Sequence, residues 1–254
     1  MRLNGKVAII TGAAKGLGEA DARLFAKEGA SVILTDMDTE NGERIAAEIG
    51  ESAEFHQQDV SDEESWKTLI DQVVHRHGKL DILVNNAGIV HPGTIETQTT
   101  EHYRAIMAVS ADATFFGCKY AIEAMKQHDG QSSIINMASV AAISGEANVL
   151  GYCGAKGAVE AMTRAVAVHC ARSDYKIRCN AILPGMILTP MVQNIQVKMT
   201  DNTEVNYTPD RYAPVKMGEP NDIAQTALFL ASDESKHLNG ASIRVDYGAT
   251  VTPR

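Results

Sequence analysis

Seven short apolar runs, rich in Val and Ile, alternate along the chain with segments of helical periodicity. Such runs predict strands, and strands separated by helices predict parallel pairing in one sheet. Their nearly continuous apolar character is typical of strands that are covered by helices on both faces. We therefore predict a doubly wound α/β fold with a seven-stranded parallel sheet and right-handed crossovers. The predicted strands are Lys6–Thr11, Ser31–Asp36, Glu54–Asp59, Leu80–Asn85, Ser132–Ala138, Ile177–Leu183 and Ser242–Asp246.

The alternation of strands and helices continues to about residue 183 without a linker, a repeat or a change in composition. A chain of 254 residues fits one large domain, so we expect a single domain over residues 1–254. Residues 184–218 differ, because they carry four of the seven prolines and mix apolar with polar side chains. We predict a mobile lid over a binding site at about residues 186–217, with a variable surface excursion as the alternative.

The net charge and the cysteines of the chain indicate which partners it binds and which cellular compartment suits it. The 23 Lys and Arg residues against 32 Asp and Glu give a formal net charge of −9, which opposes binding to nucleic acid. The four cysteines lack metal-ligand spacing and indicate neither zinc nor disulfides, as is typical of a reducing cytosol. We find no signal-peptide core and no apolar run that approaches about 20 residues. We therefore expect a soluble cytoplasmic protein without a membrane partner.

A glycine-rich turn connects the first predicted strand to an amphipathic helix, with the sequence Thr11-Gly12-Ala13-Ala14-Lys15-Gly16-Leu17-Gly18. Strand, glycine turn and helix in this order are typical of a dinucleotide-binding site. Gly12 permits the tight turn, Gly16 lets the backbone approach a pyrophosphate, and Gly18 allows the helix to pack against the sheet. The helix start offers free N–H groups to the anion, with Lys15 and Leu17 in the same turn. A purely structural turn explains isolated glycines equally well.

Asp36 ends the second predicted strand, about 20 residues beyond the glycines. A carboxylate there accepts hydrogen bonds from both ribose hydroxyls and repels a 2′-phosphate. We therefore predict NAD in preference to NADP, and we count Met37, the next residue, among the cofactor contacts. Lys15 favours the opposite choice, because a cation near the second glycine can pair with a 2′-phosphate, but a solvated lysine is the reading that we prefer.

Tyr152 and Lys156 are four residues apart, so on a helix they share one face, one turn apart. A lysine ammonium there lowers the pKa of a tyrosine, and we predict that Tyr152 is a general base with a pKa near neutrality. Ser139 ends the fifth predicted strand, at the sheet edge where ligands of such folds bind, and can hold a substrate oxygen. The alternatives are an ordinary amphipathic helix for the pair and a turn cap for Ser139.

Five motifs follow one another along the chain: Thr11-Gly12-x3-Gly16-x-Gly18, Asn85-Asn86-Ala87-Gly88, Ser139, Tyr152-x3-Lys156 and Pro184-Gly185. Together they resemble the short-chain dehydrogenase/reductase family over essentially the whole chain. The resemblance implies a Rossmann fold, with Tyr152 as the acid/base, Ser139 positioning the substrate oxygen and Lys156 binding the nicotinamide ribose. It also implies hydride transfer between nicotinamide and a carbinol carbon, without a metal.

The resemblance implies further cofactor contacts beyond the glycine turn. They are Asp59 and Val60 at the adenine, Asn86, Ala87 and Gly88 along the cofactor, Pro184 and Gly185 beside it, and Ile187 and Thr189 at the carboxamide.

The chain departs from the family at two positions. Ser110 stands where the family has a catalytic Asn, which is associated with a water that links Lys156 to solvent. If a main-chain carbonyl holds that water, Ser110 suffices, and if the Asn side chain is essential, the proton relay is impaired. Tyr247 stands where the family commonly has glycine, and we expect its ring to pack at a subunit interface.

The substrate side is less defined by the sequence. Small apolar residues at positions 140–150 predict a wall for a hydrophobic secondary alcohol or ketone, of cyclic, aryl or steroid-like kind. Similar stretches resemble those of bacterial secondary-alcohol and hydroxysteroid dehydrogenases. His91, Glu146 and Asn148 could reach the same cleft, but we expect them to be solvated loop residues.

The sequence leaves two alternative functions open and also indicates that several copies of the chain assemble. An NADPH-dependent ketone or 3-oxoacyl reductase is permitted by Lys15, and a non-catalytic NAD-binding regulator is suggested by Ser110. Family members resemble one another in assembling through the helices that carry Ser110 and Tyr152. The predicted helices Tyr103–Gln127 and Gly157–Arg172 have apolar faces, so we expect a homotetramer.

Overall fold

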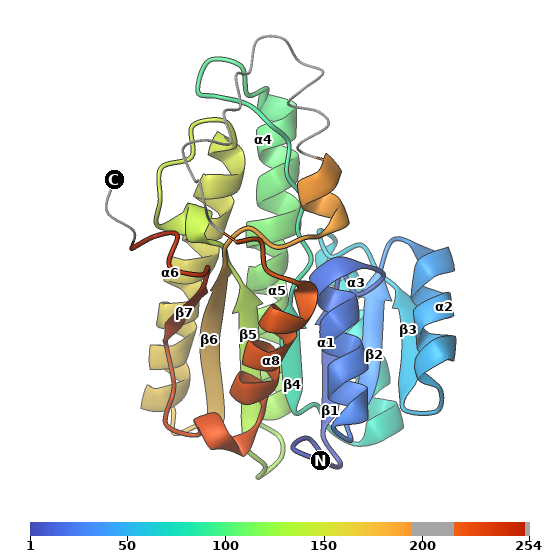
Figure 1. Ribbon diagram of the computed structural model, residues 1–254. Helices are drawn as coiled ribbons and strands as arrows, with labels where there is room; N and C mark the ends of the chain where they lie inside the picture. The colour runs from blue at the N-terminus through green and yellow to red at the C-terminus, as the bar shows by residue number, and fades with distance from the viewer. Residues whose placement is uncertain (195–215, 252–254) are drawn as a thin grey trace.

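The computed structural model describes residues 1–194 and 216–251, and seven parallel strands within them form one sheet (Figure 1). The strands are β1 (Val7–Thr11), β2 (Ser31–Asp36), β3 (Ala53–Gln57), β4 (Ile82–Asn85), β5 (Ser132–Met137), β6 (Ile177–Pro184) and β7 (Ser242–Val245). Their spatial order is β3-β2-β1-β4-β5-β6-β7, so the order reverses between β1 and β4. Ligands of such sheets bind at the carboxyl ends of the strands near this reversal. The predicted doubly wound α/β fold is confirmed.

Helices cover both faces of the sheet, as the apolar strands require (Figure 1). They are α1 (Gly16–Lys27), α2 (Thr39–Ile49), α3 (Glu63–His77), α4 (Thr100–Ile106), α5 (Ala113–Met125), α6 (Leu150–Arg172) and α8 (Pro220–Ala231). The core beneath α1, α2 and α8 contains buried Phe25 and Ile223. The core beneath α3, α5 and α6 contains buried Trp66 and Cys170.

The strand boundaries differ from the sequence prediction by at most two residues. The largest difference at the start of a strand is in β4, which begins at Ile82 rather than at Leu80. Asp81 is buried, accepts a hydrogen bond from the Val7 N–H at 2.8 Å and pairs with Lys79 Nζ at 2.9 Å. The Asp81 side chain therefore connects the residue before β4 to the start of β1.

A continuous helical run from Thr100 to Met125 comprises α4, a π-helical segment (Met107–Asp112) and α5. Contrary to the expectation from the sequence, this run is long and apolar enough to cross a membrane by length and composition, with a mean hydropathy of 1.2. It packs against α3 and α6, and 44% of the apolar window is buried inside the fold. A core helix of a globular protein meets the same criteria, so this finding is weak evidence for a span.

Candidate active site

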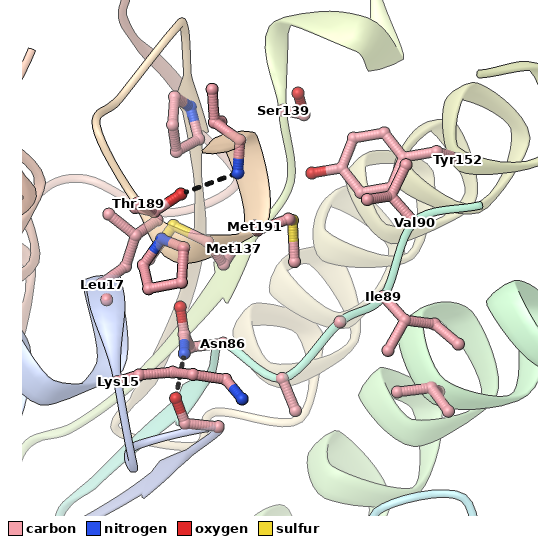
Figure 2. Close-up of a pocket in the computed structure, with 18 of the residues that line it drawn as sticks. Lys15, Leu17, Asn86, Ile89, Val90, Met137, Ser139, Tyr152, Thr189 and Met191 are labelled. Carbon is pink, nitrogen blue, oxygen red and sulfur yellow. Dashed lines mark hydrogen bonds between the residues drawn. The ribbon is translucent and has the colours of Figure 1, made fainter. Parts of the chain in front are cut away.

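A cavity of about 520 Å³ lies at the carboxyl ends of β1, β2, β4 and β5, between the glycine turn and Tyr152 on α6 (Figure 2). Among the predicted site residues, Gly18 and Ser110 do not line it. Those that do are Gly12, Lys15, Gly16, Leu17, Asp36, Met37, Asp59, Val60, Asn86, Ala87, Gly88, Ser139, Tyr152, Lys156, Pro184, Gly185, Ile187 and Thr189. The motifs that the sequence separates are therefore brought together in one place.

Two positions of the glycine turn, Gly12 and Gly18, have no room for a β-carbon. Gly12 has a φ of +64°, and a β-carbon there would lie 2.9 Å from the Ala87 Cα. A β-carbon at Gly18 would lie 2.4 Å from the Gly12 carbonyl oxygen. The turn is therefore packed directly against the start of α1 and against the loop after β4.

Asn86 connects the loop after β4 to the glycine turn. Its Nδ2 donates to the carbonyl oxygens of Thr11 at 2.8 Å and Gly12 at 3.1 Å. In return, Thr11 Oγ1 accepts from the backbone N–H groups of Asn86 at 3.1 Å and Ala87 at 3.0 Å. These four bonds fix the two cofactor-side segments relative to each other.

Asp36 holds its carboxylate in the cavity through backbone hydrogen bonds. Its Oδ2 accepts from the Ala14 N–H at 3.1 Å and its Oδ1 from the Asp38 N–H at 3.0 Å. The Lys15 side chain is largely exposed, and its Nζ lies 4.0 Å from Asp38 Oδ2. The glycine turn and the oriented Asp36 carboxylate beside it fit a dinucleotide whose ribose lies at Asp36.

Ser139 and Tyr152 lie near each other in the cavity, with the Tyr152 phenol extending from α6 toward the segment that carries Ser139 (Figure 2). Ser139 follows β5, and its Oγ also accepts from the Ala141 N–H at 3.1 Å, so it both caps a turn and faces the site. Burial raises the pKa of Tyr152 to about 12, although its hydrogen bond with Ser139 acts in the opposite direction.

Lys156 lies one helical turn beyond Tyr152 and is 3% exposed. Its Nζ donates to the Met137 carbonyl oxygen at 2.6 Å and lies 5.6 Å from the centroid of the Tyr152 ring. Burial lowers the pKa of Lys156 to about 8. The predicted lowering of the Tyr152 pKa toward neutrality is wrong for this structure, because burial of the phenol raises its pKa by more than the Ser139 hydrogen bond lowers it.

Ser110 lies in the π-helical segment, where the backbone hydrogen bonds shift by one residue and Ala113 N–H donates to the Ala108 carbonyl. Its hydroxyl is buried without a hydrogen-bond partner among residues 1–194 and 216–251. Its carbonyl accepts from Thr114 Oγ1 at 2.7 Å. The structure places Ser110 behind Gly88 rather than on the cavity wall.

Comparison with known proteins agrees with this geometry. A family model described as enoyl-(acyl carrier protein) reductase matches residues 12–250. The chain is 40% identical over 252 residues to an NADP-dependent (R)-specific alcohol dehydrogenase of Lentilactobacillus kefiri, covering 98% of each. It is 41% identical over 245 residues to a 3-beta-hydroxysteroid dehydrogenase of Comamonas testosteroni, covering 96% of each. The chain belongs to the short-chain dehydrogenase/reductase family.

A solved structure supports the same assignment. A levodione reductase shares a TM-score of 0.91 and 31% sequence identity, covering 99% of this chain and 100% of that one. As a member of the short-chain dehydrogenase/reductase family, the chain is an oxidoreductase that binds a nicotinamide cofactor.

The substrate end of this short-chain dehydrogenase/reductase differs from the prediction. None of residues 140–150 lines the cavity in the part of the chain that the structure describes. Apolar side chains there come from Ile89, Val90 and Met191 instead (Figure 2). Most of the predicted lid, residues 195–215, lies outside the described residues.

His91 and Gln58 are among the polar residues that line the cavity without having been predicted to do so. His91, which the sequence indicated to be a solvated loop residue, lies beside Val90 on the wall. Gln58 is 4% exposed, and neither polar atom of its amide has a partner among the described residues. No sequence motif marks His91 or Gln58 as a cavity residue, because the position of each side chain depends on how separate loops pack.

Proposed function

We propose that this chain is an NAD-dependent dehydrogenase that transfers hydride between nicotinamide and a secondary alcohol or ketone. The observation that carries the proposal is the hydrogen-bonded pair of Ser139 and Tyr152 in a cavity that also holds Lys156 and an oriented Asp36. A bound nicotinamide dinucleotide supplies or accepts the hydride.

Side chains of the protein itself donate and accept the proton that accompanies hydride transfer. In ketone reduction, Tyr152 donates its phenolic proton to the substrate oxygen while Ser139 donates a hydrogen bond to that oxygen. In alcohol oxidation, the Tyr152 phenolate accepts the alcohol proton. Lys156 contributes positive charge behind the tyrosine, because its ammonium is held by the Met137 carbonyl and points into the same cavity.

Ser110 acts in this proposal as a positioning residue. Its unpartnered hydroxyl lies close to the Lys156 ammonium, both bordering Gly88, which suits a water held between them. The Ser110 carbonyl is already engaged by Thr114 Oγ1. We therefore assign the hydroxyl rather than the carbonyl to that water.

The preference for NAD rests on Asp36, whose carboxylate faces the cavity where a 2′-phosphate would be repelled. The second candidate is an NADPH-dependent reductase. It is favoured by the L. kefiri relative, which is named as NADP-dependent, and by the presence of Lys15 at the glycine turn. The pairing of Lys15 with Asp38 weakens that candidate, because the cation already has an acidic neighbour.

The proposed substrate is a hydrophobic secondary alcohol or the corresponding ketone. Ile89, Val90 and Met191 supply an apolar surface next to the reacting hydroxyls. The relatives are named for an alcohol, a hydroxysteroid and levodione, which supports a secondary carbinol or ketone of this kind.

The test is the appearance of reduced nicotinamide from NAD, and separately from NADP, with cyclic, aryl, sugar and steroidal secondary alcohols. We expect turnover with NAD and a cyclic or aryl alcohol. Turnover confined to NADP supports the reductase candidate, and binding of NADH without oxidation of any alcohol contradicts both.

We further propose a homotetramer. Phe115 on α5 and Val168 on α6 are 51% and 49% exposed, on the helices expected to form the subunit contacts. Sedimentation as a 27.3 kDa monomer would contradict this assembly.

A further inference from the structure

We propose that Asn136 and Thr163 are positioning residues, which hold helix α6 on the sheet so that Lys156 and Tyr152 meet the substrate in the right geometry. The inference rests on the proposed dehydrogenase function, because the lysine and the tyrosine both lie on α6. Neither Asn136 nor Thr163 is among the described residues that line the cavity. Each therefore acts through the residues that do.

Two consecutive residues of β5 bind the same helix. Asn136 Nδ2 donates to Thr163 Oγ1 at 2.9 Å. The carbonyl of the next residue, Met137, accepts from Lys156 Nζ at 2.6 Å. Lys156 and Thr163 are seven residues apart, so they lie on one face of α6, two turns apart. The strand thus holds the helix at two points on one face, and one of these points is the Lys156 side chain itself.

Asn136 is fixed from the opposite side by the neighbouring strand β4. Its Oδ1 accepts from Asn85 Nδ2 at 2.8 Å, and the two residues are paired in register. Asn85, Asn136 and Thr163 are 4%, 0% and 0% exposed. Polar groups that are buried so deeply need their partners, because water does not replace a bond that is lost. The series from Asn85 to Thr163 therefore ties β4, β5 and α6 together.

The Thr163 hydroxyl is oriented to accept the bond from Asn136. Its own hydrogen is donated to the Val159 carbonyl at 2.8 Å, within α6. Without this hydroxyl, Asn136 Nδ2 would keep only its contacts with Cys179 Sγ at 3.4 Å and Cys118 Sγ at 3.8 Å. Sulfur is a weak acceptor, so these contacts do not compensate for the loss. Removing the hydroxyl therefore releases α6 from β5 at this point.

A displacement of α6 would affect the chemistry through Lys156. The hydrogen bond to the Met137 carbonyl favours the charged ammonium, whereas burial lowers the pKa of Lys156 to about 8. Lengthening this bond would make the charge easier to lose. It would also move Tyr152, on the same helix, from its productive position, and such misplacement lowers the rate. NADH binding depends on the glycine turn and Asp36 as well, so we expect the main effect in kcat.

The experiment removes the hydroxyl and keeps the branched shape. For Thr163→Val we expect kcat to fall about tenfold, the value of one hydrogen bond, with NADH affinity nearly unchanged. The decline of ketone reduction above about pH 8 should begin at a lower pH, because Lys156 loses its charge more easily. Thr163→Ser keeps the hydroxyl and should restore both the rate and the pH profile. Thr163→Ala gives the same test if the Val variant does not fold.

The matched control is Ser133→Ala, on the same strand. Ser133 is buried, and its Oγ donates to the Leu230 carbonyl of α8 at 2.8 Å. This bond also joins β5 to a helix, but α8 carries neither Lys156 nor Tyr152. We expect Ser133→Ala to lower the free energy of unfolding, measured by urea denaturation, about as much as Thr163→Val does. Its kcat and pH profile should match those of the wild type.

The outcomes distinguish positioning from stability. A wild-type kcat and pH profile in Thr163→Val, or an equal loss of kcat in Ser133→Ala, overturns the positioning role and leaves the dehydrogenase assignment intact. A loss in Thr163→Val that Thr163→Ser does not restore overturns it as well. Absence of any alcohol oxidation or ketone reduction by the wild type with either nucleotide overturns the proposed function and this inference together.

Discussion

Ser110 Oγ and Lys156 Nζ border the same side of Gly88, where a β-carbon would lie 3.4 Å from the hydroxyl and 3.3 Å from the ammonium. Both groups are buried, and the Ser110 hydroxyl has no hydrogen-bond partner among the residues that the structure describes. A buried hydroxyl without a partner is costly unless a water or ligand satisfies it. The two groups are therefore well placed to share a water that supports the charge on Lys156.

Changing Ser110 tests that water directly. Ser110→Ala removes the hydroxyl, and we expect kcat to fall by about tenfold, the value of one lost hydrogen bond to a charged relay. Ser110→Asn restores the family side chain and should keep or raise kcat. A loss of activity in Ser110→Asn would show that the surrounding π-helical segment has adapted to serine.

The pH dependence follows from two shifted pKa values, about 12 for Tyr152 and about 8 for Lys156. Alcohol oxidation requires the phenolate, so its kcat/KM should rise with pH up to about pH 8, above which Lys156 loses the charge that supports the phenolate. Ketone reduction requires the phenol, which stays protonated across the neutral range. Its rate should therefore remain level and then fall above about pH 8, as Lys156 loses its charge. Oxidation rates that do not change with pH would contradict this assignment.

Much of this site could be predicted from sequence because it depends on local patterns. Apolar runs placed the seven strands, and the strand ends placed Asp36 and Ser139 at one sheet edge. The pKa of Tyr152 could not be predicted, since it depends on how deeply the phenol is buried by other segments. The π-helical segment at Ser110 also has no sequence pattern of its own, because the apolar periodicity of the run continues through it.

Asp36 should control the choice of nucleotide. Removing the carboxylate in Asp36→Ala eliminates repulsion of a 2′-phosphate, and we expect the ratio of kcat/KM for NAD to that for NADP to fall about 100-fold. Lys15→Ala is the companion variant, and it should change the ratio little because Lys15 is exposed and close to Asp38. An unchanged ratio in Asp36→Ala would remove the basis for assigning NAD.

We predict that the Asp21 carboxylate, on α1, lowers the free energy of unfolding near neutral pH. It is fully buried, and neither carboxylate oxygen has a partner within the described part of the chain, so burial raises the pKa of Asp21 well above its usual value. Below about pH 3.9 both the folded and the unfolded forms are protonated, and the group has no effect on stability. As the pH rises, the unfolded chain ionises first, so stability falls until the pH passes the pKa in the folded state.

Replacement by an uncharged residue of the same shape tests this prediction. We expect Asp21→Asn to raise the free energy of unfolding at neutral pH by about 1–3 kcal/mol and to weaken its decline above about pH 4. Urea denaturation at several pH values measures both effects. Asp71→Asn, on the exposed side of α3, is the control that should leave the pH dependence unchanged. Destabilisation by Asp21→Asn at neutral pH would show that the carboxylate has a favourable role.

We propose that Tyr152 transfers the proton in an NAD-dependent alcohol oxidation. The most direct measurement is the rate of formation of reduced nicotinamide from NAD and a secondary alcohol, for the wild type and for Tyr152→Phe, together with NADH binding to both. We predict turnover by the wild type and a loss of at least about 100-fold in Tyr152→Phe, with NADH binding retained. Equal turnover by the two proteins would show that Tyr152 does not transfer the proton.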